Sequence, residues 1–174
     1  MRAMRKSTPF DIRPARREDV GTLLAMIRAL AEYEQLSHLC IAAEADLEAA
    51  LFGEQPAAEV LIAQKGDEAA GFALFFQNFS TFLGRRGIWL EDLFVRPVHR
   101  GQGCAKALLQ ALAVTAVERN CGRFEWAVLD WNMKAIGFYQ TLGATVSPDW
   151  RIVRVTGPAL AALAASAGAD HAEC

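Results

Sequence analysis

Two acidic residues stand side by side in an apolar stretch of the chain. Glu91 and Asp92 interrupt residues 88–95, which otherwise have the composition of a buried strand. A carboxylate is costly to bury without a partner, so at least one of the two should serve chemistry, by binding a cation or accepting a proton, or hold a fixed hydrogen bond. Because side chains alternate along a strand, the two should point to opposite faces unless a bulge intervenes.

A loop of small and basic residues follows this stretch. It leads into a helix whose apolar residues share one face, and its sequence is Arg100-Gly101-Gln102-Gly103-Cys104-Ala105-Lys106. The free N–H groups in the first turn of a helix bind anions, and glycine lacks the Cβ that would keep a phosphate away. The spacing matches neither the Walker loop nor the dinucleotide fingerprint. The pattern predicts an anion-binding turn between a strand and a helix.

Tyr139 is the third candidate for chemistry. Phe138 and Tyr139 are neighbours on a predicted helix, residues 133–141, and neighbours on a helix lie about 100° apart around its axis. One ring can therefore pack in the core while the other reaches a cleft. A buried tyrosine whose hydroxyl only bonds the backbone is the alternative.

The elements that would position these residues alternate between strands and helices. Apolar spacing and turn residues predict strands at residues 10–13, 58–64, 69–78, 89–95, 123–129, 144–146 and 150–155, with residues 80–87 as a loop. Helices are predicted from residue 20 to the neighbourhood of Tyr33 and Glu34, at residues 43–52, after the glycine-rich loop, and at residues 133–141 and 158–165. Asn132 is a good N-cap residue for the second-last of these helices.

Three stretches carry a resemblance to a known family. Arg100, Gly103 and Ala105 fit the Arg/Gln-x-x-Gly-x-Gly/Ala signature of the Gcn5-related N-acetyltransferases, or GNAT superfamily, and residues 90–95, 125–132 and 135–144 resemble its diamine (spermidine/spermine) or thialysine branch. The resemblance spans roughly residues 10–163. It implies an α/β (α+β) GNAT fold: a mixed, mostly antiparallel sheet of about seven strands flanked by helices, with splayed parallel strands at the cofactor site and a bulge near Glu91.

The resemblance also implies an activity, which is direct transfer of the acetyl group of acetyl-CoA to a primary amine of a small molecule, without a metal. Glu91 would take the proton of the amine, directly or through water, and Tyr139 would protonate the departing sulfur of CoA. Implied cofactor contacts come from Leu93, Phe94, Val95, Arg100, Gly101, Gln102, Gly103, Cys104, Ala105, Lys106, Asn132, Met133, Lys134, Ala135 and Tyr139. Implied amine contacts come from Tyr33, Glu34, Glu91, Glu125, Trp126 and Ala127.

Several alternatives stay open at this point. Tyr33 and Glu34 fit an ordinary solvated helix end equally well. Cys104 sits where a helix start lowers a thiol pKa, but the family uses no cysteine intermediate, so a structural role is favoured. Ser147-Pro148-Asp149 stands where polyamine enzymes of the family carry an acidic pair, which weakens spermidine or spermine as the substrate. The acceptor could also be a protein or peptide, and a non-catalytic acyl-CoA sensor would not need Glu91 and Tyr139.

Length and composition predict one domain. The chain has 174 residues, 53% of them hydrophobic, and a net charge of −2, which favours a compact domain at residues 9–166 between a disordered tip, 1–8, and a flexible tail, 167–174. Without a basic stripe, nucleic acid is not an expected partner. No apolar run approaches the roughly 20 residues that span a bilayer, so a cytoplasmic protein without membrane contact is expected. The cysteines and histidines are scattered, so no metal site is predicted. The resemblance implies a homodimer.

Overall fold

The computed structural model describes residues 9–167, and the chain separates into two compact units, one ending at Ala127 and the other beginning at Val128. The tip predicted at residues 1–8 and the tail beyond residue 167 lie outside the described residues. No helix in the described part of the chain is long and apolar enough to cross a bilayer.

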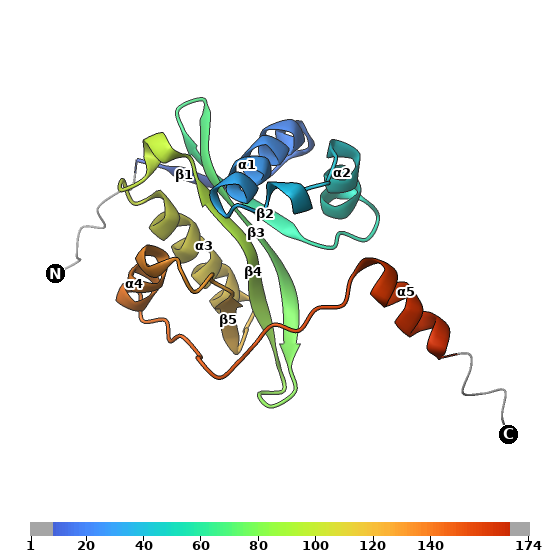
Figure 1. The fold of residues 1–174 in the computed structure, drawn as a ribbon. Helices are drawn as coiled ribbons and strands as arrows, with labels where there is room; N and C mark the ends of the chain where they lie inside the picture. Colours follow the sequence, from blue (N-terminus) through green and yellow to red (C-terminus); the bar gives the residue numbers. More distant parts are fainter. Residues whose placement is uncertain (1–8, 168–174) are drawn as a thin grey trace, which may run out of the picture. The chain divides into compact units, whose positions relative to one another are not determined.

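The first unit is built on one five-stranded sheet with strand order β1-β2-β3-β4-β5 (Figure 1). Its strands are β1 (Asp11–Pro14), β2 (Glu59–Lys65), β3 (Glu68–Ser80), β4 (Arg85–Val95) and β5 (Arg123–Trp126). Neighbouring strands are antiparallel except for β4 and β5, which are parallel. The sheet is therefore mixed and mostly antiparallel, as predicted, although the described residues hold five strands rather than about seven.

Helices cover both faces of this sheet. They are α1 (Val20–Tyr33), α2 (Glu44–Phe52) and α3 (Cys104–Glu118), with short 3-10 turns η1 (Arg17–Asp19), η2 (Ser37–Leu39) and η3 (Pro97–His99). Phe72 of β3 and Phe94 of β4 pack with Leu23 and Met26 of α1 in a buried core. On the other face, Phe75 of β3 is covered by Arg119 at the end of α3. The two faces of the sheet are therefore covered by different helices, one by α1 and the other by α3.

Two segments of the first unit differ from the prediction. Half of the loop predicted at residues 80–87 is strand, because β3 continues to Ser80 and β4 begins at Arg85. Arg85 and Arg86 hid the strand pattern, since exposed polar side chains in a hairpin give no apolar alternation. β5 ends at Trp126 instead of residue 129, and its pairing with β4 stops where Leu90 meets Trp126.

The second unit contains two helices, α4 (Met133–Thr141) and α5 (Gly157–Ser166), joined by an extended segment. The strands predicted at residues 144–146 and 150–155 are absent from the described structure: both segments are extended but carry no ladder. A strand needs a partner for its backbone groups, and apolar alternation alone does not supply one. Trp150 and Val153 are 82% and 90% exposed.

Candidate functional site

A β-bulge organises the acidic pair. Leu74 of β3 lies opposite Asp92 and Phe75 lies opposite Leu90, so Glu91 is the extra residue of β4 with no partner across the ladder. A bulge resets the alternation of side chains along a strand. Asp92 shares the face of Leu74, which packs against the α1 core. The bulge implied by the resemblance is present.

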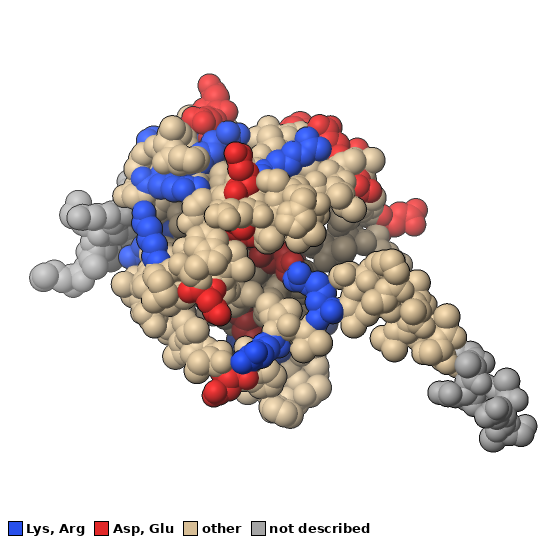
Figure 2. Space-filling model, in the orientation of Figure 1, with Lys and Arg blue, Asp and Glu red and all other residues tan. Residues whose placement is uncertain are grey.

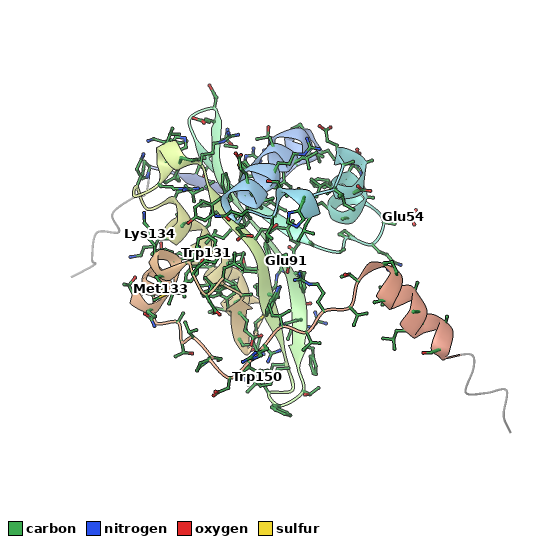
Figure 3. All side chains as sticks on the ribbon, viewed as in Figure 1. Glu54, Glu91, Trp131, Met133, Lys134 and Trp150 are labelled. Atoms are coloured by element: carbon green, nitrogen blue, oxygen red, sulfur yellow. The ribbon has the colours of Figure 1, made fainter. Side chains whose placement is uncertain are left out.

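Glu91 reaches the same face as Asp92. Its carboxylate accepts a 2.8 Å hydrogen bond from the indole Nε1 of Trp89, and Trp89 lies opposite Phe76, two residues from Leu74 along β3. Residues two apart on a regular strand share a face. The expectation that the two carboxylates point to opposite faces is therefore corrected, because the bulge turns both toward the side of α1. Figure 3 shows Glu91 beside β4.

Three carboxylates form an acidic trio: Glu34 directly after α1, and Glu91 and Asp92 on β4. Desolvation raises the pKa of Asp92 to about 6, and repulsion from Glu91 and Glu34 adds to it. Burial also raises the pKa of Glu34. Like charges gathered in a partly desolvated place lower their repulsion by taking up a proton or a cation. Negative charge is therefore concentrated at the trio.

Asp92 should make stability fall as pH rises. Its folded pKa of about 6 exceeds the reference 3.8, so its contribution is full below about pH 4 and is lost as pH rises through about 6. Asp92→Asn removes this titration. We expect the variant to be more stable than the parent by about 2 kcal/mol at pH 8, a figure discounted for partial exposure.

Urea unfolding of both proteins at pH 4.5 and pH 8 measures this difference. Glu118→Gln, at the exposed end of α3, is the matched control and should change stability by less than about 0.5 kcal/mol at either pH. An Asp92→Asn advantage that is equal at the two pH values would contradict the assignment.

Glu125 is compensated within the protein. Its Oε2 lies 2.7 Å from Nε of Arg123 and accepts a 3.3 Å hydrogen bond from Nδ2 of Asn78. Its charge is thus compensated by a neighbour on β5. Trp126, also predicted to contact the amine, has its ring centre 4.9 Å from that of Phe124 in a tilted arrangement, and Ala127 is exposed at the end of this unit.

The glycine-rich loop has the geometry of an anion site. Gly101 and Gly103 have φ of +75° and +88°, and no atom lies within 4 Å of where a Cβ would stand on either. Gly103 is the N-cap of α3, so its backbone leads into the unpaired N–H groups of the first turn. This open, positively polarised turn fits a pyrophosphate. On the face of the molecule that Figure 2 shows, lysine and arginine side chains are interspersed with aspartate and glutamate side chains.

The side chains of the loop are tied to the sheet. Arg96 donates to the carbonyl of Ala69 at 2.7 Å, and Arg100 donates from Nε to the carbonyl of Val95 at 3.0 Å. Gln102 binds the carbonyl of Val98 and accepts from Lys65, whose Nζ lies 2.7 Å from its Oε1. The loop is held by several independent bonds, and Lys65 adds a cation that the sequence pattern did not reveal.

Cys104 is buried at the start of α3, and burial raises the pKa of its thiol to about 11. A thiol at neutral pH is a poor nucleophile. The structural role favoured for this cysteine agrees with its surroundings. Lys106 and Ala105 follow in the same turn.

The second unit carries the remaining predicted residues. Asn132 caps α4, and its Oδ1 accepts a 3.2 Å hydrogen bond from the backbone of Ala135, as predicted from the sequence. Trp131, Met133 and Lys134 surround the first turn of this helix (Figure 3). Tyr139 lies on α4 with its ring 5.5 Å from that of Phe138. Within this unit α4 holds these residues together, and the trio and the loop belong to the other unit.

Asp92 and Lys65 are the two residues whose importance sequence reasoning missed. Asp92 differs from Glu91 by its burial and by the approach of Glu34, and neither is visible in a local pattern. Lys65 is at the end of β2, and the topology sets it beside the loop because β3 returns antiparallel to β4. Among residues 9–167, no group of three or more His, Cys, Asp or Glu side chains has an arrangement that could hold a metal ion.

Comparisons with known proteins identify the family of the chain. The model of the family described as Acetyltransferase (GNAT) family matches residues 23–144. Thialysine N-epsilon-acetyltransferase of Sus scrofa is 40% identical over 164 residues, covering 88% of this chain and 96% of the relative. L-ornithine N5-acetyltransferase of Arabidopsis thaliana is 34% identical over 197 residues, covering 87% of this chain and 86% of the relative.

Solved structures share the fold. An integron cassette protein from the mobile metagenome of V. cholerae matches with a TM-score of 0.76 at 27% identity, covering 91% of this chain and 99% of that one. An aminoglycoside acetyltransferase from an uncultured soil metagenomic sample matches with a TM-score of 0.72 at 17% identity, covering 85% and 96%. These matches confirm the predicted mixed α/β fold.

Proposed function

The chain belongs to the acetyltransferase (GNAT) family and is an acyltransferase, and from this premise we propose that it moves the acetyl group of acetyl-CoA to a primary amine of a small molecule. The acidic trio carries the proposal. Glu34, Glu91 and Asp92 gather negative charge beside the end of β4, where burial, together with repulsion from Glu91 and Glu34, raises the pKa of Asp92. An alkylammonium is the complementary ligand.

The loop and the strand end supply the other half of the proposed site. The first turn of α3 would hold the pyrophosphate of acetyl-CoA through backbone N–H groups, with Lys65 and Lys106 nearby as cations. Beyond Leu90 the described pairing of β4 with β5 has ended. The N–H groups of Leu93 and Val95 are therefore proposed to meet the oxygen of the thioester.

Each step of the proposed reaction is assigned to particular side chains. An alkylammonium with a pKa near 10.4 is protonated at neutral pH and cannot attack. Glu91, at the bulge, accepts its proton directly or through water, while Glu34 and Asp92 hold the cation. The free amine forms a bond to the acetyl carbon, and the carbon–sulfur bond breaks as Tyr139 gives its hydroxyl proton to the sulfur. The new nitrogen–carbon centre then releases its remaining extra proton, through water, to the Tyr139 oxygen, which restores the phenol and leaves a neutral amide. Asn132, Met133, Lys134 and Ala135 are proposed to contact acetyl-CoA alongside Tyr139.

The relatives indicate the class of amine. Two of them are named for acting on thialysine and L-ornithine, which are amino acids with a second amine at the end of the side chain. Ser147-Pro148-Asp149 lacks the acidic pair expected of a polyamine enzyme. We therefore place terminal amines of diamino acids, and short diamines, ahead of spermidine and spermine.

Release of free CoA from acetyl-CoA tests the proposal across ornithine, lysine, thialysine, putrescine, spermidine and a short peptide. Turnover with a diamino acid or short diamine is expected, with mass spectrometry locating the acetyl group on the terminal nitrogen. Turnover with the peptide alone would make the chain a peptide acetyltransferase. Binding of CoA without turnover of any amine would overturn the proposal in favour of a sensor.

Gly103→Ala should weaken acetyl-CoA binding. The substitution places a Cβ on a residue with φ of +88°, beside the N–H groups proposed to meet the pyrophosphate. We expect the KM for acetyl-CoA to rise about tenfold, from strain of about 1–2 kcal/mol and from obstruction of the anion. Steady-state kinetics at saturating amine measures it.

Gly84→Ala is the matched control for this substitution. Gly84 also has a positive φ, +60°, and open space around it, but it lies in the turn between β3 and β4. Gly84→Ala should lower the free energy of unfolding about as much as Gly103→Ala does, while the KM for acetyl-CoA stays at the parent value. Equal KM values in the two variants would remove the loop from the proposed cofactor site.

We also propose that the protein forms a homodimer. The extended segment of the second unit exposes Trp150, Ile152, Val153 and Val155, and an exposed apolar run of this kind marks an interaction surface. Light scattering should give twice the mass of one chain, and Val153→Asp should shift the protein toward the monomer. A monomeric parent protein at micromolar concentration would contradict the proposal.

A further inference from the structure

Arg100 contacts three parts of the first unit: the glycine-rich loop, the end of β4 and the end of α1. It opens the glycine-rich loop, its Nε donates to the carbonyl of Val95 at the end of β4, and its guanidinium carbon lies 4.9 Å from the centre of the Tyr33 ring. Phe94 flanks it at 5.8 Å. The side chain turns back toward the protein, although its position in the loop suggests a phosphate ligand.

Tyr33 is the last residue of α1 and immediately precedes Glu34 of the trio. Phe94 is buried in the core that α1 shares with the sheet. A cation over an aromatic ring is favoured, and guanidinium is suited to it because it is planar and weakly hydrated. Displacement of Arg100 would therefore remove contacts that stabilise both the loop and the end of α1.

We propose that Arg100 is a positioning residue that couples the acetyl-CoA loop to the amine site through Tyr33. The inference rests on the proposed function for the identity of the two ligands. Occupation of the loop holds Arg100 against Val95 and Tyr33, which holds Glu34 in place beside Asp92. Each ligand then raises the affinity for the other, since coupling between two sites is reciprocal.

Two substitutions separate this role from phosphate binding. Arg100→Lys keeps the positive charge but loses the planar cation and the Nε donor, and Tyr33→Leu removes the ring without touching the loop. At saturating acetyl-CoA, Arg100→Lys should raise the KM of the amine about fivefold or more, and Tyr33→Leu should raise the dissociation constant of CoA by a similar factor. The double variant should show less than the product of the two effects.

Matched variants serve as controls. Tyr33→Phe keeps the ring and should retain the affinity for CoA, whereas Arg28→Lys, exposed in the middle of α1, should leave both constants unchanged. Circular dichroism and the thermal midpoint establish that each variant is folded. If Arg100 only binds phosphate, Arg100→Lys alters the acetyl-CoA constants alone and Tyr33→Leu alters neither, which overturns the proposal.

The CoA titrations distinguish failure of this inference from failure of the proposed function. They need no amine and no turnover. If no amine in the panel reacts but Tyr33→Leu still weakens CoA binding, the support of the loop by Tyr33 through Arg100 stands and the proposed acceptor is wrong. If amines react normally but Tyr33→Leu binds CoA as the parent does, the acceptor stands and the coupling is wrong.

Discussion

Tyr139→Phe should lower kcat by about 10²- to 10³-fold while leaving the KM of acetyl-CoA within about twofold. The substitution removes only the hydroxyl, so the ring contact with Phe138 is kept. A general acid acts on the leaving group in the transition state, and its loss is felt in kcat rather than in binding. Steady-state kinetics with the best amine of the panel measures both constants.

Phe138→Leu is the companion variant for this measurement. It lies beside Tyr139 on α4 but carries no ionisable group, so it should change stability more than chemistry. If Phe138→Leu lowered kcat as much as Tyr139→Phe does, the packing of α4 and not proton transfer would account for the lower kcat. An unchanged kcat in Tyr139→Phe would assign the acid to another group.

Asp92→Asn should lower kcat/KM for the amine by about 10²-fold or more, because a half-buried carboxylate paired with a bound charge is worth about 2–5 kcal/mol when one partner is truncated. The pH profile is the sharper readout. In the parent protein kcat/KM should rise as pH increases through about 6, where Asp92 loses its proton. The variant should lose this limb of the profile.

Glu91→Gln separates binding from proton transfer. Glu91 is exposed and bulged, so its loss should lower kcat more than it raises the KM of the amine. It should also lower the pKa of Asp92, since one of the two repelling charges disappears. The acidic limb of kcat/KM is then expected to move toward lower pH. A limb that stays in place in both variants would remove the trio from the amine site.

Sequence patterns correctly predicted the elements whose structure is determined by residues close together in the chain. The turn that leads into α3 and the cap at Asn132 depend on residues within a few positions of each other, and both are present in the structure. The sheet hairpin was underestimated because Arg85 and Arg86 are polar strand residues. The strands predicted around Val146 and Val153 failed because pairing is a property of two segments, and one segment cannot reveal whether a partner exists.

The candidate site was harder to predict than the fold. The sequence indicated that one of the two carboxylates on β4 would serve chemistry, and the resemblance selected Glu91. The raised pKa of Asp92 arises first from its burial, and then from repulsion by Glu91, which the bulge turns to the same face, and by Glu34, which is distant along the chain. Likewise, only the fold shows that Arg123 compensates Glu125. Electrostatic environment is set by tertiary contacts, so residue types alone leave it undetermined.

The bulge at Glu91 also bears on how this enzyme can diversify. Asp92 faces Leu74 across the ladder and borders the core, so a new side chain there must be accommodated by its neighbours. Glu91 has no cross-strand partner, and its side chain is exposed. Substitutions at residue 91 should therefore be tolerated by the sheet, whereas substitutions at residue 92 should disturb the packing around Leu74. The bulge thus lets the proposed proton acceptor be exchanged for another side chain without the loss of a foldable protein.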